Sequence, residues 1–289
     1  MKRFVLAALL GAFAETSPQA APVDTGRVDL VEVAAGDMDG RLLSDLGHRV
    51  LAAKEYKWKH GQTQHFVIHF ENGIFAAKVG RMAEAFHDYI AADLQGATDR
   101  IEGRSHIFIF RNAADWKVFI QRYHQGGMEW SASMVVGPIM FLQQMGDASS
   151  SAEVLGHEMS HLVMNRFVEG GLPLWLNEGT AEWYGEFAYA AYKGVKKSKR
   201  AQFLGLRSTF PVPDLLAATA YPADTKKVHE FYSTAKHVVA FLQLEMPPDR
   251  FLPFLQDLAK GGEVEAALRD RYGVAGVAEF GERFEKFRR

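Results

Sequence analysis

Cysteine is missing from the 289 residues of this sequence. Disulfide bonds, thiol catalysis and cysteine-ligated zinc are therefore excluded, and any metal site has to be built from His, Asp and Glu side chains. A charge excess is missing as well, because 33 basic residues face 35 acidic ones and the formal net charge is −2. A chain so balanced has no general attraction for nucleic acid or anionic membranes, so we expect no nucleic-acid partner.

Long apolar runs are absent beyond the N-terminus, so we expect no integral membrane span once a leader is removed. At the N-terminus a basic pair, Lys2 and Arg3, precedes the apolar residues 4–14, and small residues follow at Ala20-Ala21. This order is typical of a secretory signal peptide, which we place at residues 1–21. We therefore expect export to the periplasm or the extracellular space, although a buried N-terminal helix would account for the same run.

Periodicity divides the rest of the chain into an earlier part with strands and a later part with helices alone. With 48% hydrophobic and 24% charged residues, the composition is that of an ordinary globular protein. Residues 65–70 and 106–110 predict strands, with a helix over 75–94 between them, and helices dominate the C-terminal third, most clearly over 232–244 and 250–260. This order predicts an α+β fold, in which a small mixed sheet with helices is followed by a mostly helical C-terminal lobe.

Less regular segments set the domain boundaries. Residues 22–60 form an N-terminal segment of mixed character, with helical spacing over 41–54. The main domain then spans 61–289, and we divide it into an α/β lobe over 61–167 and a helical lobe over 168–289.

A glycine–proline pair interrupts the strand-like stretch 134–142, which we interpret as one strand. Proline inside a strand favours a place at the edge of the sheet, where unpaired backbone groups can accept an extended peptide. Pro138 removes one donor from such an edge. Upstream, Asn112 is placed to cap a short helix that contains Trp116 and Ile120.

His157-Glu158-Met159-Ser160-His161 is an H-E-x-x-H motif. On a helix, residues four apart lie on one face, one turn apart, so both imidazoles can reach one cation. Glu158 is placed to reach a metal-bound water rather than the metal, which suits a general base. Ser150 and Glu153 have capping-box spacing in front of the motif. The plain alternative is an amphipathic helix with two unrelated histidines.

Two histidines need one more protein ligand for an open catalytic zinc site. The segment Trp175-Leu176-Asn177-Glu178-Gly179-Thr180-Ala181-Glu182 supplies acids shortly downstream. We predict Glu178 as the third ligand, just inside a helix capped by Asn177, with Gly179 leaving space beside the metal. Glu182, one turn further along, is the alternative ligand.

The two motifs together resemble those of the gluzincin zinc metallopeptidases. The similarity is greatest to the peptidase-MA-like group of bacterial proteins, where an H-E-x-x-H helix is followed by a helix beginning Trp-Leu-Asn-Glu-Gly-x-Ala-Glu. It is strong over about residues 150–184 and weaker, though consistent, in the strand–helix–strand stretch before them and at residues 231–235 after them. The resemblance implies a thermolysin-like metallopeptidase core.

The same resemblance assigns roles to the site residues. It implies one Zn²⁺ per chain held by His157, His161 and Glu178. It also implies that Glu182 accepts a hydrogen bond from a ligand histidine, which would fix the tautomer of that ring. Asn177 joins Glu182 among the residues expected to support the ligands from behind.

Tyr232 is the candidate for stabilising the tetrahedral oxyanion, because gluzincins resemble one another in using a downstream Tyr or His for this purpose. A tyrosine on the apolar face of a helix is also an ordinary core residue, and His229 and His237 are rivals for the role. The other histidines that we considered, His65, His69 and His87, have spacings that suit a metal, but we interpret them as isolated core or surface residues.

These observations predict an exported zinc metallopeptidase that acts on a peptide or protein substrate. Zinc-activated water would attack the peptide carbonyl, and Glu158 would take its proton and pass it to the leaving amine. Two alternatives remain. A zinc-containing binding or assembly module of the cell envelope would need no base, and an envelope scaffold with a coincidental motif would need no Asn-Glu-Gly-x-Ala-Glu segment. The sequence specifies neither the cleavage preference nor the oligomeric state.

Overall fold

The computed structural model describes residues 29–95, 97–124, 131–144, 149–200 and 210–287. In the range 149–200 it describes side chains only from residue 154 onward. The predicted signal peptide, residues 1–21, lies outside the described residues. The predicted capping box of Ser150 and Glu153 lies outside the described side chains.

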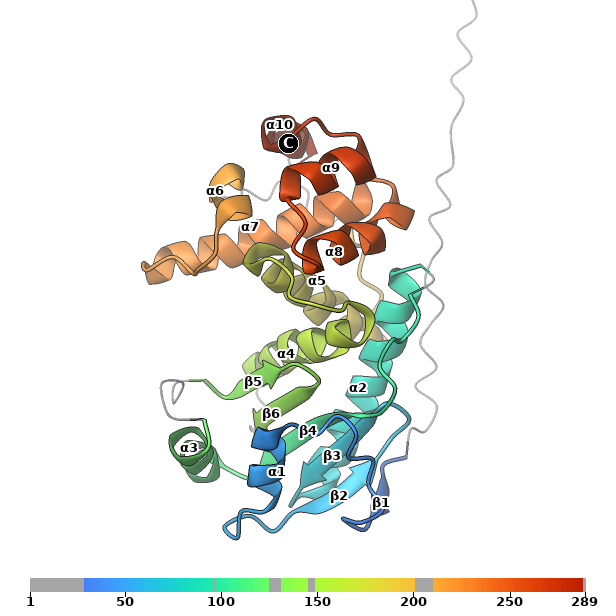
Figure 1. The fold of residues 1–289 in the computed structure, drawn as a ribbon, viewed down its shortest axis with the longest axis vertical. Coiled ribbons are helices and arrows are strands. Elements are labelled where there is room, and N and C mark those ends of the chain that lie inside the picture. Colours follow the sequence, from blue (N-terminus) through green and yellow to red (C-terminus); the bar gives the residue numbers. More distant parts are fainter. Residues whose placement is uncertain (1–28, 96, 125–130, 145–148, 201–209, 288–289) are drawn as a thin grey trace, which may run out of the picture.

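The chain forms an α+β structure with one mixed sheet of six strands, in agreement with the predicted class (Figure 1). The strands are β1 (Val31–Val33), β2 (Lys59–Gln62), β3 (Phe66–Phe70), β4 (Ser105–Phe110), β5 (Ser133–Val136) and β6 (Ile139–Gln143). Their spatial order is β1-β2-β3-β4-β6-β5, in which β3, β4 and β6 run parallel and the other neighbours run antiparallel. Helix α2 (Gly73–Asp93) makes the crossover that the parallel pair β3 and β4 requires.

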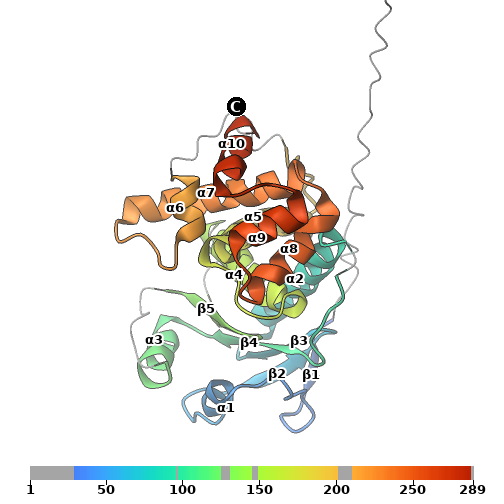
Figure 2. The same cartoon turned by 45° about the horizontal axis from the view of Figure 1, so that its top comes forward.

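The other helices follow the predicted division into an earlier mixed part and a later helical part. They are α1 (Asp45–Leu51), α3 (Ala113–Arg122), α4 (Ser149–Phe167), α5 (Leu174–Tyr192), α6 (Val212–Ala217), α7 (Thr225–Leu244), α8 (Phe251–Ala259), α9 (Val264–Tyr272) and α10 (Val277–Phe287). Figure 2 shows α8, α9 and α10 gathered beside α5 and α7. None of the helices in the described ranges is both long and apolar enough to cross a membrane.

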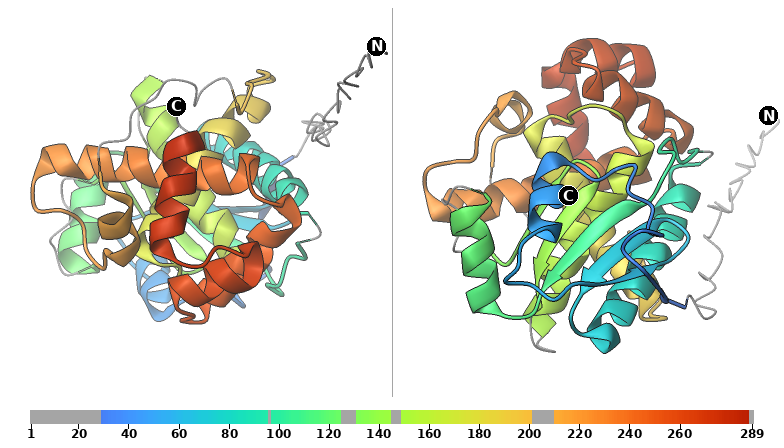
Figure 3. Two further views of the ribbon diagram at one scale, coloured as in Figure 1. Left: turned by 90° about the horizontal axis from the view of Figure 1, so that it is seen from above. Right: turned by 60° about the horizontal axis from the view of Figure 1, so that its bottom comes forward.

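Alternation along the strands builds a core on each face of the sheet. Ile107 and Ile109 of β4 pack with α2 and α4, whereas Phe108 and Phe110 point to the opposite face and pack with α1 and α3. Figure 3 shows α1, in blue, and α3, in green, on that second face. The first cluster continues from the sheet through α4, α5 and α7 to α10. The first of these two cores therefore extends through both of the predicted lobes.

The segment 22–60 contributes two strands that the sequence analysis did not predict. β1 and β2 extend the sheet beyond β3, and β2 crosses residue 60, where we placed the start of the main domain. Helix α1 begins at Asp45, later than the spacing over 41–54 predicted, because Ser44 caps it by accepting a hydrogen bond from the backbone N–H of Gly47 at 3.2 Å.

Residues 134–142 form a hairpin, and our prediction of one interrupted strand was wrong. β5 and β6 pair antiparallel, with Val136 opposite Ile139 across the two-residue turn Gly137-Pro138. Gly137 has a φ of 55°, which the first position of such a turn requires and only glycine adopts freely. β5 lies at the edge of the sheet and β6 inside it. Pro138 therefore sits in the turn and removes no donor from the edge.

Asn112 caps α3 as predicted, since its Oδ1 accepts hydrogen bonds from the N–H groups of Ala114 and Asp115 at 2.9 Å each.

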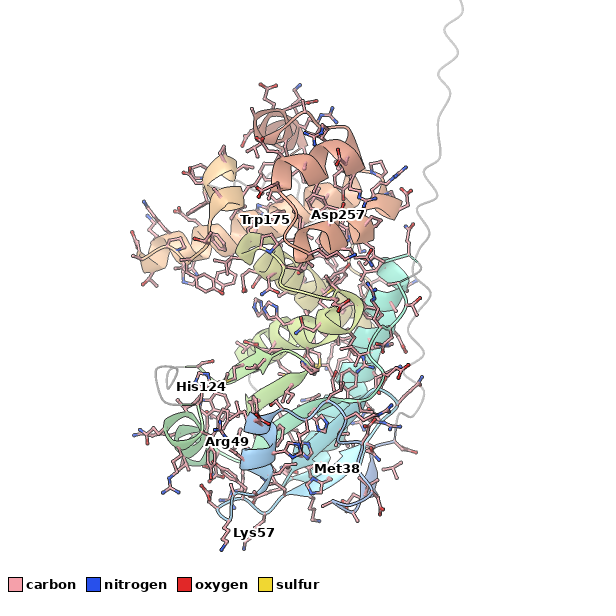
Figure 4. All side chains as sticks on the ribbon, viewed as in Figure 1. Met38, Arg49, Lys57, His124, Trp175 and Asp257 are labelled. Atoms are coloured by element: carbon pink, nitrogen blue, oxygen red, sulfur yellow. The ribbon has the colours of Figure 1, made fainter. Side chains whose placement is uncertain are left out.

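Figure 4 shows the side chains along the molecule: Trp175 and Asp257 lie among the helices, at the far end from Arg49 and Lys57.

A buried arginine anchors the C-terminal end of α4. The side chain of Arg166 is 2% exposed, and its Nε donates to Oδ2 of Asp99 at 2.7 Å. Its other nitrogens donate to the hydroxyl of Ser105 at 3.0 Å and to the carbonyl of Gly103 at 3.0 Å. A buried charge is tolerated when it is paired and its donors are satisfied, as they are here. The end of α4 is thus fixed against the loop that leads into β4.

Three histidines form a chain across the sheet. Nδ1 of His60 lies 2.9 Å from Nδ1 of His69, and Nε2 of His69 lies 2.9 Å from Nδ1 of His106. Burial lowers the pKa of His69 well below its usual value and lowers that of His106 to about 4, so these rings are neutral at pH 7. The sequence analysis interpreted His69 as an isolated residue, and the structure shows it hydrogen-bonded on both sides.

Gly179 of α5 lies against α7, and our prediction that it leaves space beside the metal was wrong. A Cβ atom at this position would come within 2.6 Å of the backbone oxygen of Ala235 and 2.9 Å of Cγ2 of Val239. Backbone atoms of α7 therefore lie directly against this position of α5, and a side chain here would require one of the two helices to move.

We expect Gly179→Ala to lower the free energy of unfolding by about 1–3 kcal/mol, because the added methyl group overpacks this contact. Gly281→Ala in α10 is the matched control. A Cβ atom there meets nothing within 4 Å, so the better helix propensity of alanine should stabilise the protein by up to about 1 kcal/mol. Urea unfolding of both variants measures the difference, and equal stabilities would contradict the close approach of α5 and α7.

Candidate metal centre

Helix α4 places the two motif histidines on one face. Nε2 of His157 and Nε2 of His161 lie 3.1 Å apart, and the two rings are almost perpendicular, with an interplanar angle of 80°. Both side chains are partly buried. A helix alone gives this arrangement, because positions four apart stack one turn above the other.

Helix α5 brings Glu178 to the same point. Its Oε2 lies 3.2 Å from Nε2 of His157 and 3.6 Å from Nε2 of His161, and the residue is 4% exposed. The helix begins at Leu174, with Pro173 at the cap position and no side-chain capping bond. Our prediction that Asn177 caps α5 was therefore wrong, because this residue lies one turn inside the helix. It contacts the predicted ligand instead, since its Nδ2 donates to Oε1 of Glu178 at 3.3 Å.

Two glycines let α4 and α5 approach closely enough for this convergence. A Cβ atom on Gly156 would lie 3.0 Å from the backbone oxygen of Gly185, and one on Gly185 would lie 3.1 Å from the backbone nitrogen of His157. Such spacings are tighter than most real Cβ contacts, so a side chain at either position would require the neighbouring backbone to move by a few tenths of an ångström. No motif or spacing in the sequence pointed to either glycine.

Glu182 lies behind the site. Its Oε1 accepts a hydrogen bond from Nδ1 of His157 at 3.0 Å. This bond places a proton on Nδ1, so Nε2, on the side of His161 and Glu178, is the nitrogen with which this ring would bind a metal. Glu182 therefore orients His157 and does not join the three converging atoms.

Electrostatics favour an ionised carboxylate here. Burial by itself would raise the pKa of Glu178, but hydrogen bonds with His157 and His161 hold it well below its usual range. Burial would likewise lower the pKa of His157, yet the bonds to Glu178 and Glu182 raise it to about 10. Two carboxylates around two imidazoles thus make a site that attracts positive charge, whether a proton or a metal cation supplies it.

The three predicted ligands fit a zinc ion. Zinc bonds to His nitrogen and carboxylate oxygen are 2.0–2.2 Å long, and a tetrahedral arrangement puts the ligand atoms about 3.3–3.5 Å apart. The separations here are 3.1, 3.2 and 3.6 Å. Two imidazole nitrogens and one carboxylate oxygen form a common donor set for catalytic zinc, with a fourth position left for water or substrate.

A second cluster of possible ligands, His65, His87 and Asp99, is arranged differently. The rings of His65 and His87 stack with centroids 3.7 Å apart and an interplanar angle of 16°. Since imidazole lone pairs lie in the ring plane, two parallel rings cannot direct them at one ion. Oδ2 of Asp99 is already occupied by Arg166 at 2.6 Å and by Nε2 of His87 at 3.1 Å. This cluster is an ion-paired structural network.

Glu158 follows His157 along α4, and Tyr232 of α7 lies next to the ring of His157. Glu158 is partly buried and makes no hydrogen bond or ion pair with any residue of the described part of the chain. The ring of Tyr232, on α7, lies 6.0 Å from the ring of His157. Burial and the charge of Glu178 raise the pKa of Tyr232 well above its usual value, so its hydroxyl keeps the proton and can donate it.

The rival histidines are placed differently. His237 is buried at 6% exposure within α7, and His229 is exposed near the start of that helix. Tyr221 was not among the predicted site residues, yet its hydroxyl donates to Oε1 of Glu178 at 2.9 Å. It lies in the loop between α6 and α7, where no periodic pattern pointed to it.

Comparison with known proteins adds no relative to this picture. No protein-family model matches the sequence, and no curated protein matches it. The geometry of the site and the resemblance of the two motifs are therefore the grounds for a function.

Proposed function

We propose that this protein is a zinc-dependent metallopeptidase of the gluzincin type with a thermolysin-like core, most similar to the peptidase-MA-like group, and that it is exported to the periplasm or extracellular space of a bacterium. The observation that carries the proposal is the convergence of His157, His161 and Glu178 at separations that suit one zinc ion. Glu182 supports it, because a carboxylate behind a ligand histidine is the usual companion of such a site.

Each side chain around the metal position has its own role in peptide hydrolysis. Zinc, when bound, lowers the pKa of a coordinated water toward neutrality and polarises the scissile carbonyl. Glu158 accepts a proton from the attacking water and then delivers it to the leaving amine. Tyr232 donates a hydrogen bond to the carbonyl oxygen as negative charge develops there. Glu182 holds His157 in the tautomer that presents Nε2 to the site.

The edge strand β5 gives the substrate a place to bind. It lies against α4, and no described strand pairs with its outer side. Val136 pairs with Ile139 next to the turn, so alternate residues, Ser133 and Val135, direct their N–H and C=O groups outward. Ser131 already occupies the groups of Ser133, accepting from its N–H at 3.3 Å and donating to its carbonyl at 2.5 Å. An extended peptide would therefore pair at Val135.

Metal analysis and a cleavage assay on the full-length protein test the proposal together. We expect one zinc per chain and cleavage within a peptide library that stops with a chelator and returns with zinc. Zinc without any cleavage would favour the binding or assembly module instead. Protein that binds no zinc would mean that the motif is coincidental and would overturn the proposal.

A further inference from the structure

Tyr221 connects the predicted metal ligand Glu178 to the loop between α6 and α7. The residue is 47% exposed, yet its hydroxyl donates to Oε1 of Glu178, a residue that is only 4% exposed, at 2.9 Å. The ring also stacks on that of Tyr232, with centroids 5.9 Å apart and an interplanar angle of 19°. An exposed aromatic residue that directs its one polar atom at a buried acid has a specific partner rather than a general packing role.

The two oxygens of Glu178 have separate environments. Oε2 faces Nε2 of His157 and Nε2 of His161, at 3.2 and 3.6 Å. Oε1 points the other way and accepts from the hydroxyl of Tyr221 at 2.9 Å and from Nδ2 of Asn177 at 3.3 Å. These donors hold the carboxylate so that one oxygen alone is presented to the histidines. Without the stronger of the two bonds, the group could rotate and offer both oxygens.

Tyr221 also contacts Tyr232, because the two rings stack next to the hydrogen bond that Tyr221 donates to Glu178. Ionised Glu178 only accepts hydrogen bonds, so Tyr221 gives it the single phenolic proton. Tyr221 therefore links the acid on α5 to the tyrosine on α7, by a hydrogen bond on one side and by ring stacking on the other.

We propose that Tyr221 is a positioning residue, which holds Glu178 with one oxygen toward the histidines and supports the ring of Tyr232 by stacking. The inference rests on the proposed function, because it assumes that Glu178 binds the metal. Tyr221 itself neither binds the metal nor transfers a proton in the reaction. Its effect reaches the metal through Glu178 and the substrate through Tyr232.

Tyr221→Phe in the full-length protein tests this role, because it removes one oxygen atom and keeps the ring. We expect zinc affinity, measured by competition with a chromogenic chelator, to fall about 10–100-fold, as is typical when a residue that supports a ligand is lost. The cobalt-substituted variant should lose intensity in its visible bands, since a carboxylate that binds through both oxygens raises the coordination number above four. At saturating zinc, kcat should fall more than KM changes.

Two matched tyrosine variants separate the possible outcomes. Tyr232→Phe should lower kcat and leave zinc affinity and the cobalt spectrum unchanged, because phenylalanine keeps the ring that stacks on Tyr221 and the hydrogen bond from Tyr221 to Glu178 stays intact. Tyr189→Phe, on α5, should change none of these quantities. If wild-type protein binds zinc and Tyr221→Phe binds it equally well with the same cobalt spectrum, Tyr221 has no positioning role and the proposed function still stands. If wild-type protein binds no zinc, both proposals fail.

Discussion

Glu158→Gln is expected to abolish peptide hydrolysis and to leave the zinc content of the protein unchanged. Glutamine has the size of glutamate but cannot accept a proton from water, and loss of a general base typically lowers the rate 10²–10⁴-fold. The substitution should not disturb the site, because among the described residues Glu158 has no hydrogen-bond or ion-pair partner to lose. Zinc analysis and steady-state cleavage of the best library peptide, on one protein preparation, measure both quantities.

The matched control for this experiment is Glu169→Gln. Glu169 is exposed and lies just beyond the end of α4, so the same chemical change on it should affect neither zinc content nor cleavage. If Glu158→Gln retains the wild-type rate, another group is the base and the assignment from the H-E-x-x-H spacing is wrong. If it loses zinc as well as activity, Glu158 contributes to the metal site itself.

Glu178→Ala is expected to lose the zinc altogether and with it all cleavage activity. The variant keeps two imidazoles but has no third ligand, and three protein ligands are the rule for catalytic zinc. Equilibrium dialysis against zinc measures the loss directly. Circular dichroism should show that the variant remains folded, because the core on both faces of the sheet does not depend on this residue.

Glu182→Ala is the graded comparison for Glu178→Ala. Glu182 accepts a hydrogen bond from His157 and touches none of the other converging atoms, so its removal should weaken zinc binding about 10–100-fold without abolishing it. Equal losses in the two variants would mean that both acids ligate the metal, and a larger loss in Glu182→Ala would exchange their roles.

Local periodicity is what made much of the architecture predictable. The predicted ends of helix α2 and strand β4 lie within two residues of the observed ends. In both elements the spacing of the apolar residues repeats often enough to define the element. The pairing of His157 with His161 followed from the geometry of a single helix. β1 and β2 were missed because they are short, and the polar sequence Lys59-His60-Gly61-Gln62 carries no alternation of its own. Their strand character comes from pairing with β3.

Contacts between distant segments were beyond the sequence. The hydrogen bond from Tyr221 to Glu178 spans 43 residues and depends on how the loop before α7 returns to α5. The chain of His60, His69 and His106 depends on the register of three strands. Gly179 was assigned to the wrong side of its helix for the same reason, since no pattern in α5 says where α7 crosses it.

The contact of Gly156 with Gly185 sets the distance between α4 and α5 by main-chain atoms, not by side-chain rotamers. The two helices cannot come closer at this point, and no flexible side chain lies between them there. The donors on the two helices are thus spaced in advance of any cation, and little ordering entropy remains to be lost when one arrives. Unlike a small domain that folds around its zinc, this framework should keep its shape when stripped of metal and take it up again without refolding.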